Sequence, residues 1–217
     1  MNNAKKLDDF KRGLETLITR FVESIRPTAV AQHLGASGGE PLEHTTRAYF
    51  IDHLLIALGW NLKDPGGDVV EEARVKDETT LFLDFLGVQP ETRAPTMIVE
   101  AKAWSKPLVT PSKATVSSQS SAAKYDRQAL IAAAIEHAKR GGAIEQSPVT
   151  SEWAEWIGKL TDYVRVTHRN SGHVVSRAVL TTGKWTVIIV DPDRQFENGG
   201  IVNAEGILIY EFDDFVG

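Results

Sequence analysis

Two apolar runs joined by a short turn-forming segment place the strongest limit on how this chain can fold. Residues 81–88 read LFLDFLGV and residues 96–102 read TMIVEAK, with QPETRAP between them. Apolar runs of this length, bounded by turn residues, predict buried strands over 80–88 and 96–102. The runs nevertheless carry Asp84, Glu100 and Lys102. Because unpaired charge strongly opposes burial, these three side chains need one another, or a ligand, as partners.

The alternation of side chains along a strand indicates where these charges lie. Glu100 and Lys102 are two residues apart and therefore share a face of their strand. The segment 89–95 is long enough to join antiparallel neighbours. If the two strands pair in this way, Asp84, Glu100 and Lys102 converge at one edge of the sheet.

The remaining periodicity predicts a mixed α/β domain with a central sheet flanked by helices. We expect one domain over 1–217, made of an N-terminal helical extension (1–40), a core (41–190) and a C-terminal strand (191–217). The segment 104–121 is poor in apolar residues and predicts a mobile loop. Helices are expected over 4–25, 42–58, 122–140 and 151–168, and further strands over 68–76, 174–181, 185–190 and 206–212.

The composition excludes several kinds of site. The chain has no Cys, so it has neither disulfides nor thiol nucleophiles nor Cys-bound metals. Its six His are scattered without H-x-x-x-H or H-x-H spacing. It has no G-x-S-x-G, Walker or G-x-G-x-x-G motif. These absences argue against a His-bound metal, a Ser–His–Asp hydrolase and an ATP-driven motor.

Charge and hydropathy limit the partners. The net charge of −5 argues against a protein that binds DNA only through a broad basic surface. The N-terminal MNNAKKLDDFKRG has no apolar core of a signal peptide. No run approaches the roughly 18 apolar residues of a membrane span. We therefore expect a cytoplasmic protein with no membrane partner.

A cluster of two carboxylates and one ammonium supports a specific chemistry. Asp84 and Glu100 would repel each other, and a shared divalent cation removes that conflict. Ligand sets made only of oxygen suit Mg²⁺ or Mn²⁺, which acidify a bound water. Lys102 can orient that water or stabilise charge on a phosphate. The alternative is a structural salt bridge of Lys102 with Asp84 or Glu100, because E-x-K is a common tripeptide.

The order of the motifs resembles a known nuclease family. Four segments carry the resemblance: EHTTRAYFIDHLLIALGW (43–60), LFLDFLG (81–87), MIVEAK (97–102) and TTGKW (181–185). They are similar to the PD-(D/E)xK nuclease superfamily, and most of all to the N-terminal nuclease domain of type I restriction endonuclease motor subunits. The resemblance covers about residues 41–190. It implies a restriction-endonuclease-like core and a Mg²⁺-dependent DNA endonuclease that acts in restriction or other defence against foreign DNA.

The resemblance also implies roles for individual residues. Asp84, Glu100 and the Ala101 carbonyl would bind the metal, and Lys102 would orient the attacking water. Glu43 would join them as a further metal ligand or as a partner of Lys102. The alternative for Glu43 is an acid favoured by the helix N-terminus, paired with Arg47 four residues on.

The chain departs from the family pattern in three places. Leu83, not Pro, precedes Asp84, and Thr182 stands where relatives often have Asn. Relatives often carry Gln-x-x-x-Tyr on the helix after the Lys strand, whereas Gln128 is followed four residues later by Ala132. Gln128 would help to position the phosphate or the Lys, and the alternative is an exposed first helical turn. Lys124 lies on the same helical stripe as Gln128, and the same two alternatives apply to it.

Other basic residues and the Trp side chains give weaker signals. Arg74, Lys76, Lys184 and Arg194 are candidate phosphate contacts, although an ordinary surface position explains each of them. Lys106 and Lys113 lie in the 104–121 segment, which could close over DNA. Most of the five Trp occupy helical or strand positions, which favours core packing over base stacking.

Rival functions share the same fold. The domain could have lost cleavage and act as a DNA-binding or protein-docking module, or it could cut RNA or single strands with the same site. The negative charge and the lone domain indicate a missing partner, either a second copy or a larger specificity or motor subunit.

Overall fold

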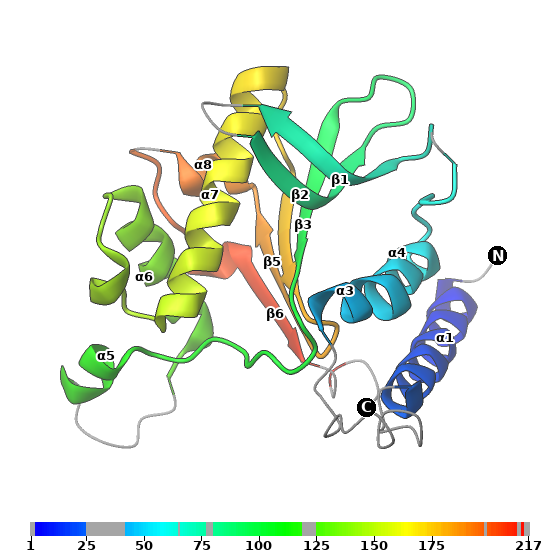
Figure 1. Ribbon diagram of the computed structural model, residues 1–217, viewed down its shortest axis with the longest axis horizontal. Helices are drawn as coiled ribbons and strands as arrows, with labels where there is room; N and C mark the ends of the chain where they lie inside the picture. Colours follow the sequence, from blue (N-terminus) through cyan, green and yellow to red (C-terminus); the bar gives the residue numbers. More distant parts are fainter. Residues whose placement is uncertain are drawn as a thin grey trace, which may run out of the picture.

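A six-stranded sheet organises the molecule, with its strands in the order β1-β2-β3-β4-β5-β6 (Figure 1). The computed structural model describes residues 3–24, 42–64, 66–76, 80–118, 125–197, 199–211 and 214. The strands are β1 (Val69–Lys76), β2 (Thr80–Val88), β3 (Pro95–Ala101), β4 (Arg177–Thr181), β5 (Trp185–Val190) and β6 (Ile207–Glu211). β3 and β4 pair in parallel, and the other neighbouring pairs are antiparallel. The expected mixed α/β architecture is therefore confirmed.

Helices cover both faces of this sheet (Figure 1). The parallel β3–β4 pair requires a long crossover, and α5, α6 and α7 lie within it. The helical segments are α1 (Asn3–Ser24), α3 (Glu43–Thr46), the π-helix η1 (Arg47–Ile51), α4 (Asp52–Ala57), α5 (Lys113–Ser118), α6 (Arg127–Lys139), η2 (Ile144–Gln146), α7 (Ser151–Ser171), α8 (Pro192–Phe196) and η3 (Ala204–Gly206). No helix in the described part of the chain is long and apolar enough to cross a membrane.

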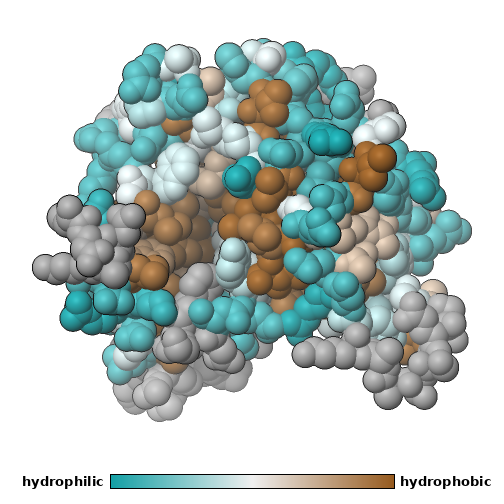
Figure 2. Space-filling model, turned by 180° about the vertical axis from the view of Figure 1, so that it is seen from behind, coloured by the Kyte–Doolittle hydropathy of each residue, from teal (hydrophilic) through white to brown (hydrophobic). Residues whose placement is uncertain are grey.

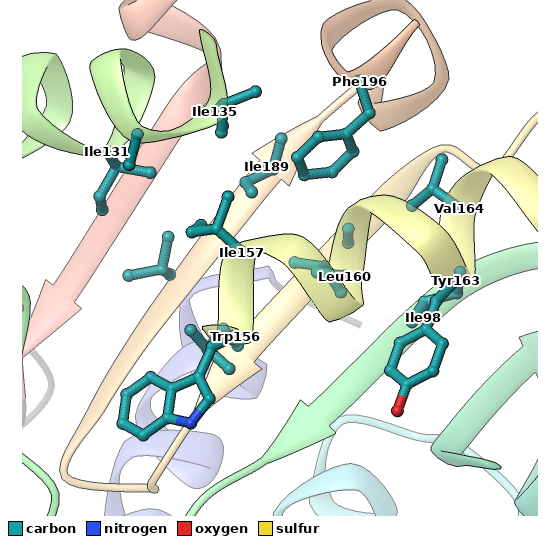
Figure 3. Packing of buried hydrophobic residues seen from close by; sticks show 14 of the residues in the cluster. Ile98, Ile131, Ile135, Trp156, Ile157, Leu160, Tyr163, Val164, Ile189 and Phe196 are labelled. Atoms are coloured by element: carbon teal, nitrogen blue, oxygen red, sulfur yellow. The ribbon is translucent and has the colours of Figure 1, made fainter. Parts of the chain in front are cut away.

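The core consists of two apolar clusters, one on each face of the sheet. The first joins α6, α7 and α8 to the sheet, and Figure 3 shows Ile157, Leu160 and Val164 of α7 beside Ile98 and Ile189. The second joins α1, η1 and α4 to the opposite face. Ile98 lies in the first cluster and its neighbour Val99 in the second, as strand alternation requires.

The β1–β2 hairpin leaves the plane of the sheet and crosses α7 (Figure 1). Glu72 has a positive φ of 48°, which locally bends β1. Beyond this point Ala73, Val75 and Leu83 pack in the α7 cluster, whereas Phe85 packs in the cluster on the opposite face of the sheet. The hairpin therefore packs against α7 and helps to hold this helix on the sheet.

Several elements differ from the sequence expectations. The segment 104–121 contains α5, because the Ser112 hydroxyl accepts a hydrogen bond from the Thr115 N–H at 3.3 Å and caps a helical turn. The strand expected from residue 174 begins at Arg177. The helix expected over 42–58 is interrupted by the π-helical η1. Lys124 lies outside the described residues.

Candidate active site

The register of β2 and β3 brings the predicted acids together. Phe85 pairs with Val99 and Leu86 with Ile98, so the continued register sets Asp84 opposite Glu100. The Asp84 Oδ2 accepts a hydrogen bond from the Ala101 N–H at 2.8 Å. Asp84 thus caps the end of β3 with its side chain.

Lys102 lies immediately after β3 and joins two acids from different elements. Its Nζ is 2.8 Å from the Glu100 Oε1 and 3.3 Å from the Glu43 Oε2. Its backbone N–H donates to the Thr181 carbonyl at 2.8 Å, which fixes the chain end beside β4. Only 5% of Lys102 is exposed, and its Nζ lies 6.0 Å from the centre of the Trp156 ring. Glu100 and Lys102 therefore form a buried ion pair, which the exposed Glu43 joins from the start of α3.

A second cation, Arg47, completes the charge pattern, and sequence reasoning gave it no role in the site. Its guanidinium lies 3.0 Å from the Asp84 Oδ1 and 2.6 Å from the Glu72 Oε1. The alternative that paired Glu43 with Arg47 is not what the structure shows, because Glu43 pairs with Lys102. The sequence signal that could have pointed to Arg47 is its four-residue spacing from Glu43, which puts both residues on one side of the helix.

The protonation equilibria show an excess of negative charge at Lys102. Burial alone would lower the pKa of Lys102, but Glu100, Glu43 and Asp84 outweigh it and raise the pKa. Burial raises the pKa of Glu100, Asp84 and Glu43 add to this, and Lys102 opposes it only in part. The pKa values of both Lys102 and Glu100 are raised, because Glu100 is buried and one ammonium serves several carboxylates. We take Lys102 to be protonated, since a neutral amine would leave those acids without compensation.

Tyr163 of α7 is a second residue that sequence reasoning missed. Burial raises the pKa of its hydroxyl, and Glu100, Asp84 and Glu43 raise it further. Figure 3 shows the hydroxyl directed away from the labelled apolar side chains. The apolar periodicity of this helix did not indicate a role for Tyr163, because Tyr163 lies beside the apolar residues Leu160 and Val164.

Gln128 does not join this cluster. Its side-chain amide donates a hydrogen bond to the Ile207 carbonyl, which ties the start of α6 to β6. Asp126 caps the same helix by accepting from the N–H groups of Gln128 and Ala129. The sequence left open whether Gln128 joins the site or lies in an exposed first turn, and it could not show that this helix would meet β6.

The oxygen atoms at this edge fit a hard cation. In the described part of the chain, no three His, Asp or Glu side chains are arranged to hold a metal ion. Mg²⁺ needs only one or two carboxylates, because waters and substrate phosphates supply its other ligands. Asp84, Glu100 and the Ala101 carbonyl supply oxygen atoms of this kind, and the pKa of Glu100 is raised first by its burial and further by Asp84 and Glu43.

Comparisons with known protein families, with curated proteins and with solved structures give no match for this chain.

Proposed function

We propose that this protein is a divalent-metal-dependent DNA endonuclease with a restriction-endonuclease-like core. The observation that supports it most is the meeting of Asp84, Glu100 and Lys102 where β2 and β3 run side by side. A purely structural sheet does not require two acids and a buried ammonium at this point. The four sequence segments that resemble PD-(D/E)xK nucleases support the same proposal.

The chain's own groups divide the work of phosphodiester hydrolysis. Asp84, Glu100 and the Ala101 carbonyl would hold Mg²⁺ or Mn²⁺, which when bound acidifies water and neutralises phosphate charge. Lys102 keeps its proton and donates hydrogen bonds to the attacking water or to a phosphate oxygen. Glu43 and Glu100 orient the Lys102 ammonium, and Arg47 holds Asp84 in place.

The setting we propose is restriction or other defence against foreign DNA in the cytoplasm. Because the net charge is −5, attraction of DNA must come from local charge and bound metal. A second copy of the chain, or a larger specificity or motor subunit, would supply the rest of the DNA-binding surface.

Cleavage assays with matched variants test this proposal. Supercoiled plasmid, circular single-stranded DNA and an RNA of similar length are incubated with Mg²⁺, Mn²⁺ or EDTA. We expect metal-dependent cleavage that falls about 100-fold or more in Lys102→Ala and Asp84→Ala. Arg140, the highly exposed residue that follows α6, provides the control, and Arg140→Ala should cut normally. Circular dichroism verifies that each variant is folded. Equal activity of wild type and both site variants would reject the assignment.

A cleavage-inactive binding module is the second candidate, and one observation favours it. Lys102 and Arg47 together engage Glu43, Glu72, Asp84 and Glu100, as a structural ion-pair network would. This candidate predicts no cleavage of any of the three nucleic acids and no heat of Mg²⁺ or Mn²⁺ binding by calorimetry.

A further inference from the structure

An exposed aromatic and cationic pair lies beside the candidate site on the β1–β2 hairpin. Phe82 is 56% exposed, so its ring is open to a ligand. The guanidinium of Arg74 stands over its ring at 5.6 Å from the centroid. Arg74 and Phe82 are register partners on neighbouring strands, so the backbone holds the two side chains together.

This pair continues the row of acids in the site. Phe82 lies two residues before Asp84 on β2, and Arg74 lies two residues after Glu72 on β1, so the pair follows the acids directly along the hairpin. The Cα atoms of Phe82 and Asp84, two residues apart along β2, are separated by about 6.6 Å. The pKa of Glu72 is lowered chiefly by Arg47 and to a smaller extent by Arg74, which agrees with this placement.

The opposite side of the hairpin is already occupied. Ala73, Val75 and Leu83 point into the apolar cluster around α7. Packing against the core therefore explains those three residues and leaves Phe82 and Arg74 with no such role.

We propose that Phe82 and Arg74 bind one unpaired nucleotide next to the phosphate that is cut, so that the substrate of the site is a single-stranded segment of nucleic acid. This inference rests on the proposed nuclease function. The Phe82 ring would stack on a base, and the Arg74 guanidinium would contact a phosphate. In an intact duplex the bases are stacked and paired, so they are not open to such a platform. The spacing between successive nucleotides of an extended single strand is comparable with the distance from Phe82 to Asp84.

Binding assays in EDTA separate this proposal from cleavage. Fluorescence anisotropy measures the affinity for fluorescein-labelled oligo-dT, oligo-rU and a hairpin duplex of equal length. We expect Phe82→Ala to bind both single strands roughly 5-fold more weakly or worse, and to bind the duplex as wild type does. Phe82→Trp should restore single-strand affinity. The ratio of the dT and rU affinities shows which nucleic acid the site prefers.

Two further measurements locate the contacts. An oligonucleotide with abasic sites should remove the difference between wild type and Phe82→Ala, because the lost interaction is with a base. Arg74→Ala should reduce the slope of log affinity against log salt by about 0.7, the value for one phosphate of a single strand. Tyr49→Ala and Arg140→Ala serve as exposed aromatic and exposed cationic controls, and both should bind normally.

The outcomes are distinguishable from those of the cleavage assays. Failure of wild type to bind either single strand, or equal losses for single strand and duplex in Phe82→Ala, would overturn this inference even if plasmid is cut. Normal dependence on Phe82 in a protein that cuts nothing would leave the binding platform in place and reject the nuclease.

Discussion

At the scale of single residues, Arg47 balances part of the negative charge of the acids. It bridges Asp84 and Glu72 through one guanidinium. Removing it leaves a mostly buried Asp84 with less positive charge nearby. We expect Arg47→Ala to lower the free energy of unfolding by about 1–2 kcal/mol in EDTA.

Added metal should recover part of that loss. Millimolar Mg²⁺ should raise the thermal midpoint of Arg47→Ala by more than it raises that of wild type, because a bound cation replaces the missing charge. Arg140→Ala, whose nearest acid is Glu136 at 3.6 Å on an exposed helix face, should change stability by less than about 0.5 kcal/mol. An equal deficit of Arg47→Ala with and without Mg²⁺ would contradict cation binding beside Asp84.

Asp52 is a half-buried acid that opposes folding at neutral pH. Burial raises its pKa from 3.8 to about 6, and Glu71 adds to the shift while Arg47 opposes it. Its Oδ1 is buried without a hydrogen-bond partner. Because the folded pKa lies above the unfolded one, the favourable effect of protonation is complete below about pH 4 and is lost as pH rises through about 6.

Asp52→Asn should therefore stabilise the protein at high pH. With allowance for solvent screening of a half-exposed group, the gain should be about 1–2 kcal/mol at pH 8 and near zero at pH 4. Urea unfolding of wild type and variant across this range measures it. The exposed Glu145→Gln should show no such trend, and a pH-independent difference for Asp52→Asn would show that its titration is not the cause.

At the scale of elements, the β4–β5 turn meets η1 at Gly183. Its φ is 82°, and a Cβ atom there would lie 2.4 Å from two carbon atoms of the Phe50 ring. Phe50 is itself packed against Trp104 at 5.2 Å between ring centres, so it has little room to move. We expect Gly183→Ala to lower the free energy of unfolding by about 2–3 kcal/mol.

A second glycine provides the matched control. Gly158 lies within α7, and a Cβ atom there would meet nothing within 4 Å. Gly158→Ala should therefore stabilise the protein by about 0.5–1 kcal/mol through helix propensity. Urea unfolding compares both variants with wild type. Equal effects at the two positions would show that the Phe50 contact and the positive φ of Gly183 do not matter.

The sequence predicted elements best where the signal was local. β2 coincides with the predicted 80–88, and the β2–β3 pairing that joins Asp84 to Glu100 followed from a short connection. The bend at Glu72 carries no hydropathy signal, so the hairpin over α7 could not be foreseen. Gln128 was expected to join the site or to lie in an exposed first turn, whereas its bond to β6 depends on a long-range arrangement that periodicity does not encode.

At the scale of the whole molecule, α1 is part of the second core cluster. Leu14, Ile18 and Phe21 are buried in it, although the sequence suggested only a helical extension. The Phe21 ring lies 4.9 Å from Trp104 and 5.4 Å from Phe50, between ring centres. Periodicity indicated an apolar stripe but not its target, because the contacts of α1 are with residues far along the chain.

The stability of α1 should therefore be coupled to that of the sheet. Phe21→Ala should cost about 3–4 kcal/mol through lost burial and the cavity left behind. Leu7→Ala, at a position of the same helix that is 55% exposed, should cost less than about 0.5 kcal/mol. Urea unfolding measured by far-ultraviolet circular dichroism and by Trp fluorescence should give one coincident transition, because Trp104 reports the second cluster and Trp153 the first. An early loss of helical signal without a change in fluorescence would show that α1 unfolds on its own and does not support the position of η1, and with it of Arg47.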